Sequence, residues 1–130
     1  MSSHRMTFNH VGLSVSDRKR SRRFYECVLG FQFWWELGPP DGPTAKLVQL
    51  PEPLGVHATY LVRDGFVLEL IDYSEHEVHA GPERVMDQVG LTHISLSVSD
   101  PLVYATPSKD RRTSVICFTL VPRDQDRSKR

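Results

Sequence analysis

The chain has 130 residues and a mass of 14.9 kDa, enough for one hydrophobic core and therefore for a single domain. Hydrophobic residues make up 39% and charged residues 25% of it, with sixteen basic and sixteen acidic side chains, so net charge favours neither nucleic acid nor a membrane surface. No apolar run approaches the roughly 20 residues that span a bilayer, and the N-terminus lacks a signal-peptide core. We therefore expect a cytoplasmic protein without nucleic-acid or membrane partners.

The first predicted element is a strand within residues 8–17, FNHVGLSVSD. Apolar side chains alternate there with small or polar ones, as on a strand with one buried face. The apolar set is Val11, Leu13 and Val15. His10 then lies on the opposite face beside Gly12 and Ser14, where small neighbours leave room for a ligand.

A helix is predicted next, because Ser16 or Asp17 is suited to cap its start and Gly30 to end it. The inward positions are Phe24, Tyr25, Val28 and Leu29. The basic run over residues 18–23 falls on the outer side, and we interpret it as a solvated surface in preference to a phosphate contact.

Residues 31–73 have the pattern of a strand meander. The expected strands are 31–37 (FQFWWEL), 45–50 (AKLVQL), 57–62 (HATYLV) and 66–73 (FVLELIDY). Proline and glycine mark the first turn at residues 38–43, and Arg63-Asp64-Gly65 predicts a tight hairpin turn before the last strand.

Residues 91–100 read LTHISLSVSD and repeat the pattern of residues 8–17, which makes His93 the counterpart of His10. The polar stretch 74–90 between them contains Gly-Pro and has the character of a linker. We therefore predict a first module over 6–73, a linker over 74–90 and the start of a second module over 91–130.

Glu69 lies between two leucines in the strongest predicted strand. A carboxylate in an apolar strand either faces solvent at an edge or meets a cation. Two imidazoles and one carboxylate, from His10, His93 and Glu69, form a ligand set that holds a divalent ion and leaves positions open for substrate. Such an ion polarises substrate oxygens while a proton leaves the neighbouring carbon.

Taken together, FNHVGLSVSD, the helix ending FYECVLGF, the acid in VLELIDY and GLTHISLSVSD resemble the vicinal oxygen chelate superfamily of glyoxalases, bleomycin resistance proteins and extradiol dioxygenases. The resemblance implies an α+β fold in which βαβββ modules form a cupped mixed sheet around a metal. It implies that His10, Glu69 and His93 are the metal ligands, with Glu69 also catalytic, and that the ion is Zn, Co, Ni, Mn or Fe.

The closest branch by resemblance is that of methylmalonyl-CoA epimerase and the glyoxalases. This implies a metal-dependent epimerase or lyase that moves a proton alpha to a carbonyl of a small-molecule substrate such as a CoA thioester or thiol adduct. Two alternatives stay open: a ring-cleaving extradiol dioxygenase, and a non-catalytic drug-binding or small-molecule-binding protein of the same fold. The binding protein would use the aromatic residues Phe33, Trp34, Trp35 and Tyr60.

The sequence departs from the family pattern after Asp100, because residues 101–130 contain no Glu to act as a fourth ligand. We therefore expect an incomplete or divergent second module, with an activity that its missing last strand impairs. An exposed sheet edge would favour a homodimer. Cys27 and Cys117 have no metal-type spacing and are expected to be reduced thiols.

Overall fold

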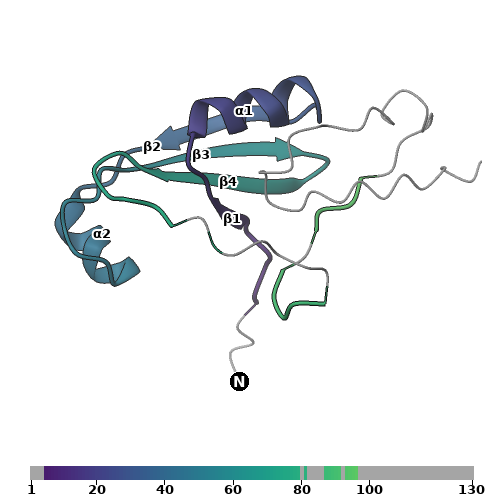
Figure 1. Ribbon diagram of the computed structural model, residues 1–130. Coiled ribbons are helices and arrows are strands. Elements are labelled where there is room, and N and C mark those ends of the chain that lie inside the picture. The colour runs from purple at the N-terminus through teal and green to yellow at the C-terminus, as the bar shows by residue number, and fades with distance from the viewer. Residues whose placement is uncertain (1–4, 80, 82–86, 92, 97–130) are drawn as a thin grey trace, which may run out of the picture. The chain divides into compact units, whose positions relative to one another are not determined.

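The computed structural model describes residues 5–79, 81, 87–91 and 93–96. Packing divides the chain into two units, Met1–His79 and Ala80–Arg130, and every helix and strand of the described residues lies in the first. The elements in chain order are β1 (Val11–Ser14), α1 (Arg18–Cys27), β2 (Gln32–Leu37), α2 (Asp41–Val48), β3 (Val56–Arg63) and β4 (Phe66–Tyr73) (Figure 1).

The four strands form one mixed sheet in the order β1-β4-β3-β2. β1 runs parallel to β4, whereas β3 is antiparallel to both of its neighbours. The tight turn between β3 and β4 places Asp64 and Gly65 at positive φ, 49° and 76°, as a two-residue hairpin loop requires. The α+β fold class and the βαβββ order of the first module are confirmed, with α2 as an addition between β2 and β3.

Helix α1 covers one side of the sheet (Figure 1), which we call the helix face. The side chain of Asp17 caps its first turn by accepting a hydrogen bond from the backbone N–H of Arg20 at 2.9 Å, and Gly30 follows its end at a φ of 68°. Val28 is exposed, so its predicted inward position is wrong. The buried apolar residues between helix and sheet include Tyr25, Leu29, Phe31, Leu61, Leu68 and Leu70.

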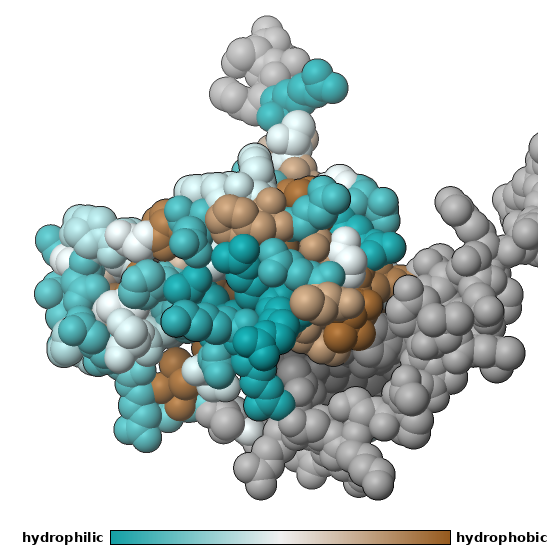
Figure 2. All heavy atoms as spheres, turned by 90° about the horizontal axis from the view of Figure 1, so that it is seen from above, coloured by the Kyte–Doolittle hydropathy of each residue, from teal (hydrophilic) through white to brown (hydrophobic). Residues whose placement is uncertain are grey.

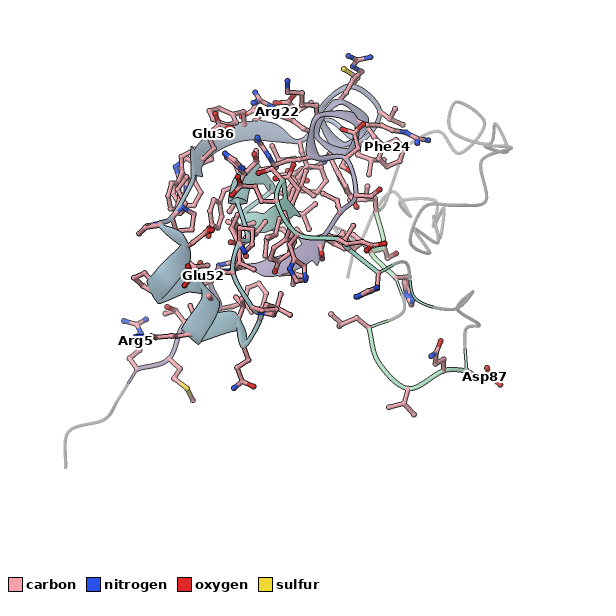
Figure 3. All side chains as sticks on the ribbon, turned by 60° about the vertical axis from the view of Figure 1, so that its left-hand side comes forward. Arg5, Arg22, Phe24, Glu36, Glu52 and Asp87 are labelled. Carbon is pink, nitrogen blue, oxygen red and sulfur yellow. The ribbon has the colours of Figure 1, made fainter. Side chains whose placement is uncertain are left out.

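The basic residues of α1 divide between solvent and the sheet. Arg18 reaches back over the helix face, where its guanidinium donates to Asp72 at 3.1 Å, Thr59 at 2.7 Å and Glu36 at 3.1 Å. The Arg22 guanidinium lies 4.2 Å from the centre of the Phe33 ring, on the side of α1 that meets β2 (Figure 3). The prediction of a fully solvated basic run is therefore wrong at these two positions.

Seen from the α1 side, the described surface is mostly hydrophilic, with separate apolar patches (Figure 2). This agrees with the basic outer side of the helix. No helix in the described part of the chain has the length and apolar character that crossing a membrane requires.

The strand predicted at residues 45–50 is instead the end of helix α2. Pro40 has an extended backbone at its N-cap, and Thr44 bonds back to the carbonyl of Pro40 at 2.7 Å. Pro43 falls in the first turn, where a missing N–H disturbs no helical hydrogen bond. Asp41 also accepts from the backbone N–H groups of Leu54 and Gly55, at 2.9 and 3.0 Å. These contacts, including those of Asp41 with residues 54 and 55, stabilise a helix where the apolar run of residues 45–50 favours a strand.

Candidate metal centre

The side of the sheet opposite α1 carries two of the candidate ligands, His10 and Glu69. Because facing residues of paired strands point to the same side, the pairings of Gly12 with Glu69 and of Glu69 with Tyr60 set these three residues on one surface. His10 precedes the first residue of β1 and lies on the same surface, where its ring meets Glu69. Trp35 pairs with Tyr60. We call this surface, defined by His10, Trp35, Tyr60 and Glu69, the site face.

His10 and Glu69 form the central contact of the site face. The imidazole Nε2 of His10 lies 3.1 Å from Oε2 of Glu69, and their side chains are 33% and 13% exposed. A Cβ built on Gly12 would come within 3.1 Å of the same carboxylate oxygen. Glycine at this position therefore keeps the space beside the pair open, as the small neighbours of His10 predict.

The hydrogen bond of His10 to Asn9 bears on what can lie between the pair. Nδ1 of His10 is 2.6 Å from Oδ1 of Asn9, an acceptor, so Nδ1 carries the hydrogen. A neutral imidazole then points the lone pair of Nε2 at a carboxylate oxygen. Two electron-rich atoms 3.1 Å apart need a cation, either a proton or a metal ion.

The residues present fit a divalent ion. Nitrogen and oxygen ligands at about 2.0–2.2 Å from one ion stand roughly 3.0–3.4 Å apart, and the observed separation of 3.1 Å is within that interval. Imidazole and carboxylate together are suited to zinc and to the first-row divalent ions. The pair thus has the chemistry of two adjacent metal ligands.

Tyr60 fixes the other oxygen of the carboxylate. Its hydroxyl donates to Oε1 of Glu69 at 2.5 Å, and its ring meets His10 edge-on with 5.4 Å between ring centres. Burial of Tyr60, followed by its hydrogen bond to Glu69, raises the pKa of the hydroxyl to about 12. Tyr60 therefore stays a hydrogen-bond donor at neutral pH and leaves Oε2 as the oxygen that faces His10.

Ionisation of Tyr60 should occur near pH 12 and should oppose folding. Because the folded-state pKa lies above the ordinary value of 10.0, the stabilisation is complete below pH 10 and is lost as the pH rises to about 12. Tyrosinate absorbance, recorded immediately after pH jumps for the wild type and for Tyr60→Phe, isolates this group as a difference. If the ionisation that Tyr60→Phe removes from the wild-type curve lies near pH 10 and not near pH 12, the assignment is wrong.

Of the three predicted ligands, His10 and Glu69 lie in the first unit and are in contact, whereas His93 belongs to the second unit. Within the described ranges, no three His, Cys, Asp or Glu residues form a group that could hold a metal. The expectations about a fourth ligand, and those about residues 97–130 and Cys117, lie outside the described residues. The ligand set His10, Glu69 and His93 stays a prediction.

The sequence reasoning named Tyr60 only as an aromatic candidate and did not foresee its bond to Glu69. A signal for it was present. A two-residue Asp64-Gly65 loop pairs Arg63 with Phe66, and counting outward from that pair sets Tyr60 opposite Glu69. Asn9 carried no comparable signal, because its contact depends on the side-chain orientations of two neighbouring residues.

The fold and the site together define a class of protein: an α+β chain built on a βαβββ module, with an imidazole and a carboxylate on one face of the sheet. The chain belongs to the Glyoxalase/Bleomycin resistance protein/Dioxygenase superfamily, whose family model matches residues 7–120. This confirms the resemblance stated from the sequence at the level of the superfamily.

Solved structures agree with this fold. A glyoxalase family protein from Bacillus cereus superposes with a TM-score of 0.69 at 14% identity, covering 80% of this chain and 71% of its own. A glyoxalase family protein from Enterococcus faecalis gives a TM-score of 0.51 at 18% identity, covering 75% of this chain and 65% of its own. At these identities the likeness concerns the fold. A search of curated proteins found no match.

Proposed function

We propose that the chain is a metal-dependent epimerase or lyase that transfers a proton at the carbon alpha to a carbonyl, in the manner of methylmalonyl-CoA epimerase. The observation that carries this proposal is the 3.1 Å approach of His10 Nε2 to Glu69 Oε2, supported by membership of the superfamily. His93 from the second unit is the third ligand of the proposal. The ion would be Zn, Co, Ni, Mn or Fe.

A divalent ion at this place would supply a Lewis acid for two adjacent substrate oxygens. The neighbouring residues of the chain orient the two ligands. Asn9 holds the hydrogen of His10 on Nδ1, which leaves Nε2 free to act as a ligand. Tyr60 occupies Oε1 of Glu69, so the carboxylate presents Oε2. Glu69 is also the residue to which the proposal assigns the catalytic role.

The proposed substrate is a small molecule with two neighbouring oxygens, such as a CoA thioester or a thiol adduct. The active form is proposed to be a homodimer. In the described part of the sheet, the edge strands β1 and β2 each have one neighbour, and an edge of this kind is suited to pairing with a second copy.

Hydrogen exchange at the substrate carbon tests the reaction. Full-length protein loaded with Co²⁺ should incorporate deuterium from deuterium oxide at the alpha carbon of methylmalonyl-CoA. His10→Ala should lower the rate by at least about 100-fold, the scale of a lost metal or acid-base contribution. His57→Ala is the matched control, because His57 pairs across the sheet with Asp72 on the helix face and should leave exchange unchanged.

Equal exchange in the wild type and in His10→Ala, or exchange that survives a chelator, would contradict the proposal. Oxygen consumption with catechol and ferrous iron would redirect it to the dioxygenase alternative.

A second candidate function is metal-free binding of a small molecule, as in drug-binding members of the fold. The observation that favours it is the exposure of Trp34 and Trp35, 59% and 41%, since large exposed aromatic residues are typical of binding surfaces. Protection of the wild type by a ligand against thermal unfolding in the presence of a chelator would support this candidate over metal chemistry.

A further inference from the structure

The carboxylate of Glu69 has a different neighbour at each of its oxygens. β4, which carries Glu69, lies between β1 and β3 in the sheet. Oε2 is 3.1 Å from Nε2 of His10, the residue before β1. Oε1 accepts the hydrogen bond of Tyr60, on β3, at 2.5 Å. The side chain of Glu69 is only 13% exposed, so these neighbours, more than solvent, determine how each oxygen can bind an ion.

The two oxygens also differ in the space beside them. Gly12 pairs with Glu69 across β1 and β4, and a Cβ at Gly12 would lie 3.1 Å from Oε2. The absence of a side chain there leaves Oε2 open. Oε1 instead has a phenol beside it, at the short end of the usual distances for a hydrogen bond to a carboxylate. An ion that took both oxygens would compete with this hydrogen bond.

A register shift in β2 provides the ring that packs on Tyr60. Residues two apart on a regular strand share a face. Phe33 pairs with Leu61, however, whereas Trp35 pairs with the adjacent residue of β3, Tyr60. The shift between Phe33 and Trp35 therefore turns Trp35 to the site face. Its indole stacks on the Tyr60 ring with 4.4 Å between centres and 2° between planes. Irregularities of this kind re-aim side chains and are common beside active sites.

A second ring contact restrains Tyr60 further. The imidazole of His10 meets the phenol ring edge-on, at an interplanar angle of 89° and with 5.4 Å between centres. Stacked and edge-on contacts are the two arrangements that aromatic rings prefer. Tyr60 is also 9% exposed, so its ring has little freedom to turn. Its hydroxyl is therefore held at Oε1 of Glu69.

We propose that Tyr60, held in place by Trp35, makes Glu69 a one-oxygen ligand and thereby keeps a coordination position of the ion open for substrate. The inference rests on the proposed metal centre and adds how its open position is maintained. A carboxylate binds an ion through one oxygen or through both, and a catalytic ion needs a position that no protein atom occupies. Tyr60 and Trp35 are positioning residues, because they act on the ion only through the carboxylate.

Tyr60→Phe removes the hydroxyl and keeps the ring, so it tests this role while the stack on Trp35 stays. In the Co²⁺-loaded full chain, the variant should retain the ion and bind acetohydroxamate, which takes two adjacent positions, at least about tenfold more weakly than the wild type. The visible absorption of bound Co²⁺, which depends on the number of its ligands, should change as well. Tyr73→Phe removes a hydroxyl farther along β4 and is the matched control, with wild-type values expected in both measurements.

Variants of Trp35 test the contribution of the stack. Trp35→Leu removes the aromatic face and should move both measurements toward those of Tyr60→Phe. Trp35→Phe keeps a ring on which Tyr60 can stack and should retain the wild-type values. An equal change in the two variants would contradict the role of Trp35.

Unchanged absorption and unchanged acetohydroxamate affinity in Co²⁺-loaded Tyr60→Phe would overturn the inference and leave the metal centre intact. A wild type that binds no Co²⁺ would overturn the metal centre, and this inference with it. Loss of Co²⁺ from Tyr60→Phe, at unchanged thermal unfolding of the metal-free protein, would mean that Tyr60 is needed for metal binding as such. That result would also overturn the inference.

Discussion

Glu69→Gln should weaken the affinity of the chain for a divalent metal ion by at least about 100-fold. Outer-shell changes around a metal alone lower affinity by roughly 10–100-fold, and this substitution removes a charged ligand. The amide keeps the size of the side chain and still accepts the hydrogen bond from Tyr60, so folding should be little affected. Zinc affinity, measured by competition with a chromophoric chelator, checks the prediction.

Glu26→Gln is the control for this experiment. Glu26 lies on α1 and pairs with Arg22 at 3.2 Å, a partly exposed pair four residues apart on the helix, of small energetic weight. Glu26→Gln removes the same charge as Glu69→Gln, but Glu26 lies away from the site face. Equal zinc affinity in Glu69→Gln and in the wild type would remove Glu69 from the ligand set.

Leu70→Ala should lower the free energy of unfolding by about 3 kcal/mol, within the range found for leucine truncation in packed cores. Leu70 is fully buried in β4, one residue from Glu69, and its loss leaves a cavity under the strand that carries the carboxylate. Denaturant unfolding measures the change. Leu47→Ala, at a position 82% exposed on α2, should shift stability by less than about 0.5 kcal/mol.

A small effect of Leu70→Ala, comparable with that of Leu47→Ala, would mean that the sheet and α1 do not form the packed layer described above. Such a result would also weaken the argument for a rigid site face, because β3 and β4 position both Tyr60 and Glu69.

Local patterns were sufficient for most of the first module. Alternation of apolar and small residues predicted the face on which His10 lies, and Asp17 predicted the start of α1 through its capping side chain. The Asp64-Gly65 loop predicted the hairpin between β3 and β4. Each of these features depends on residues a few positions apart, where sequence spacing determines geometry.

The features that sequence reasoning missed depend on contacts between distant segments. α2 forms where the apolar run suggested a strand, because Asp41 binds backbone groups of Leu54 and Gly55. Nothing in FQFWWEL indicates that the register of β2 shifts between Phe33 and Trp35, since this shift follows from pairing with β3. Arg18 turns away from solvent because it forms ion pairs with Glu36 and Asp72. Both acids belong to strands that lie far from Arg18 in the sequence.

The central claim is that His10 and Glu69 are ligands of one divalent ion. Elemental analysis of purified full-length protein, loaded with zinc and then dialysed, tests it most directly when His10→Ala is treated in parallel. The account predicts a stoichiometric ion in the wild type and its loss in His10→Ala. A wild type without metal, or equal metal in both proteins, would contradict it.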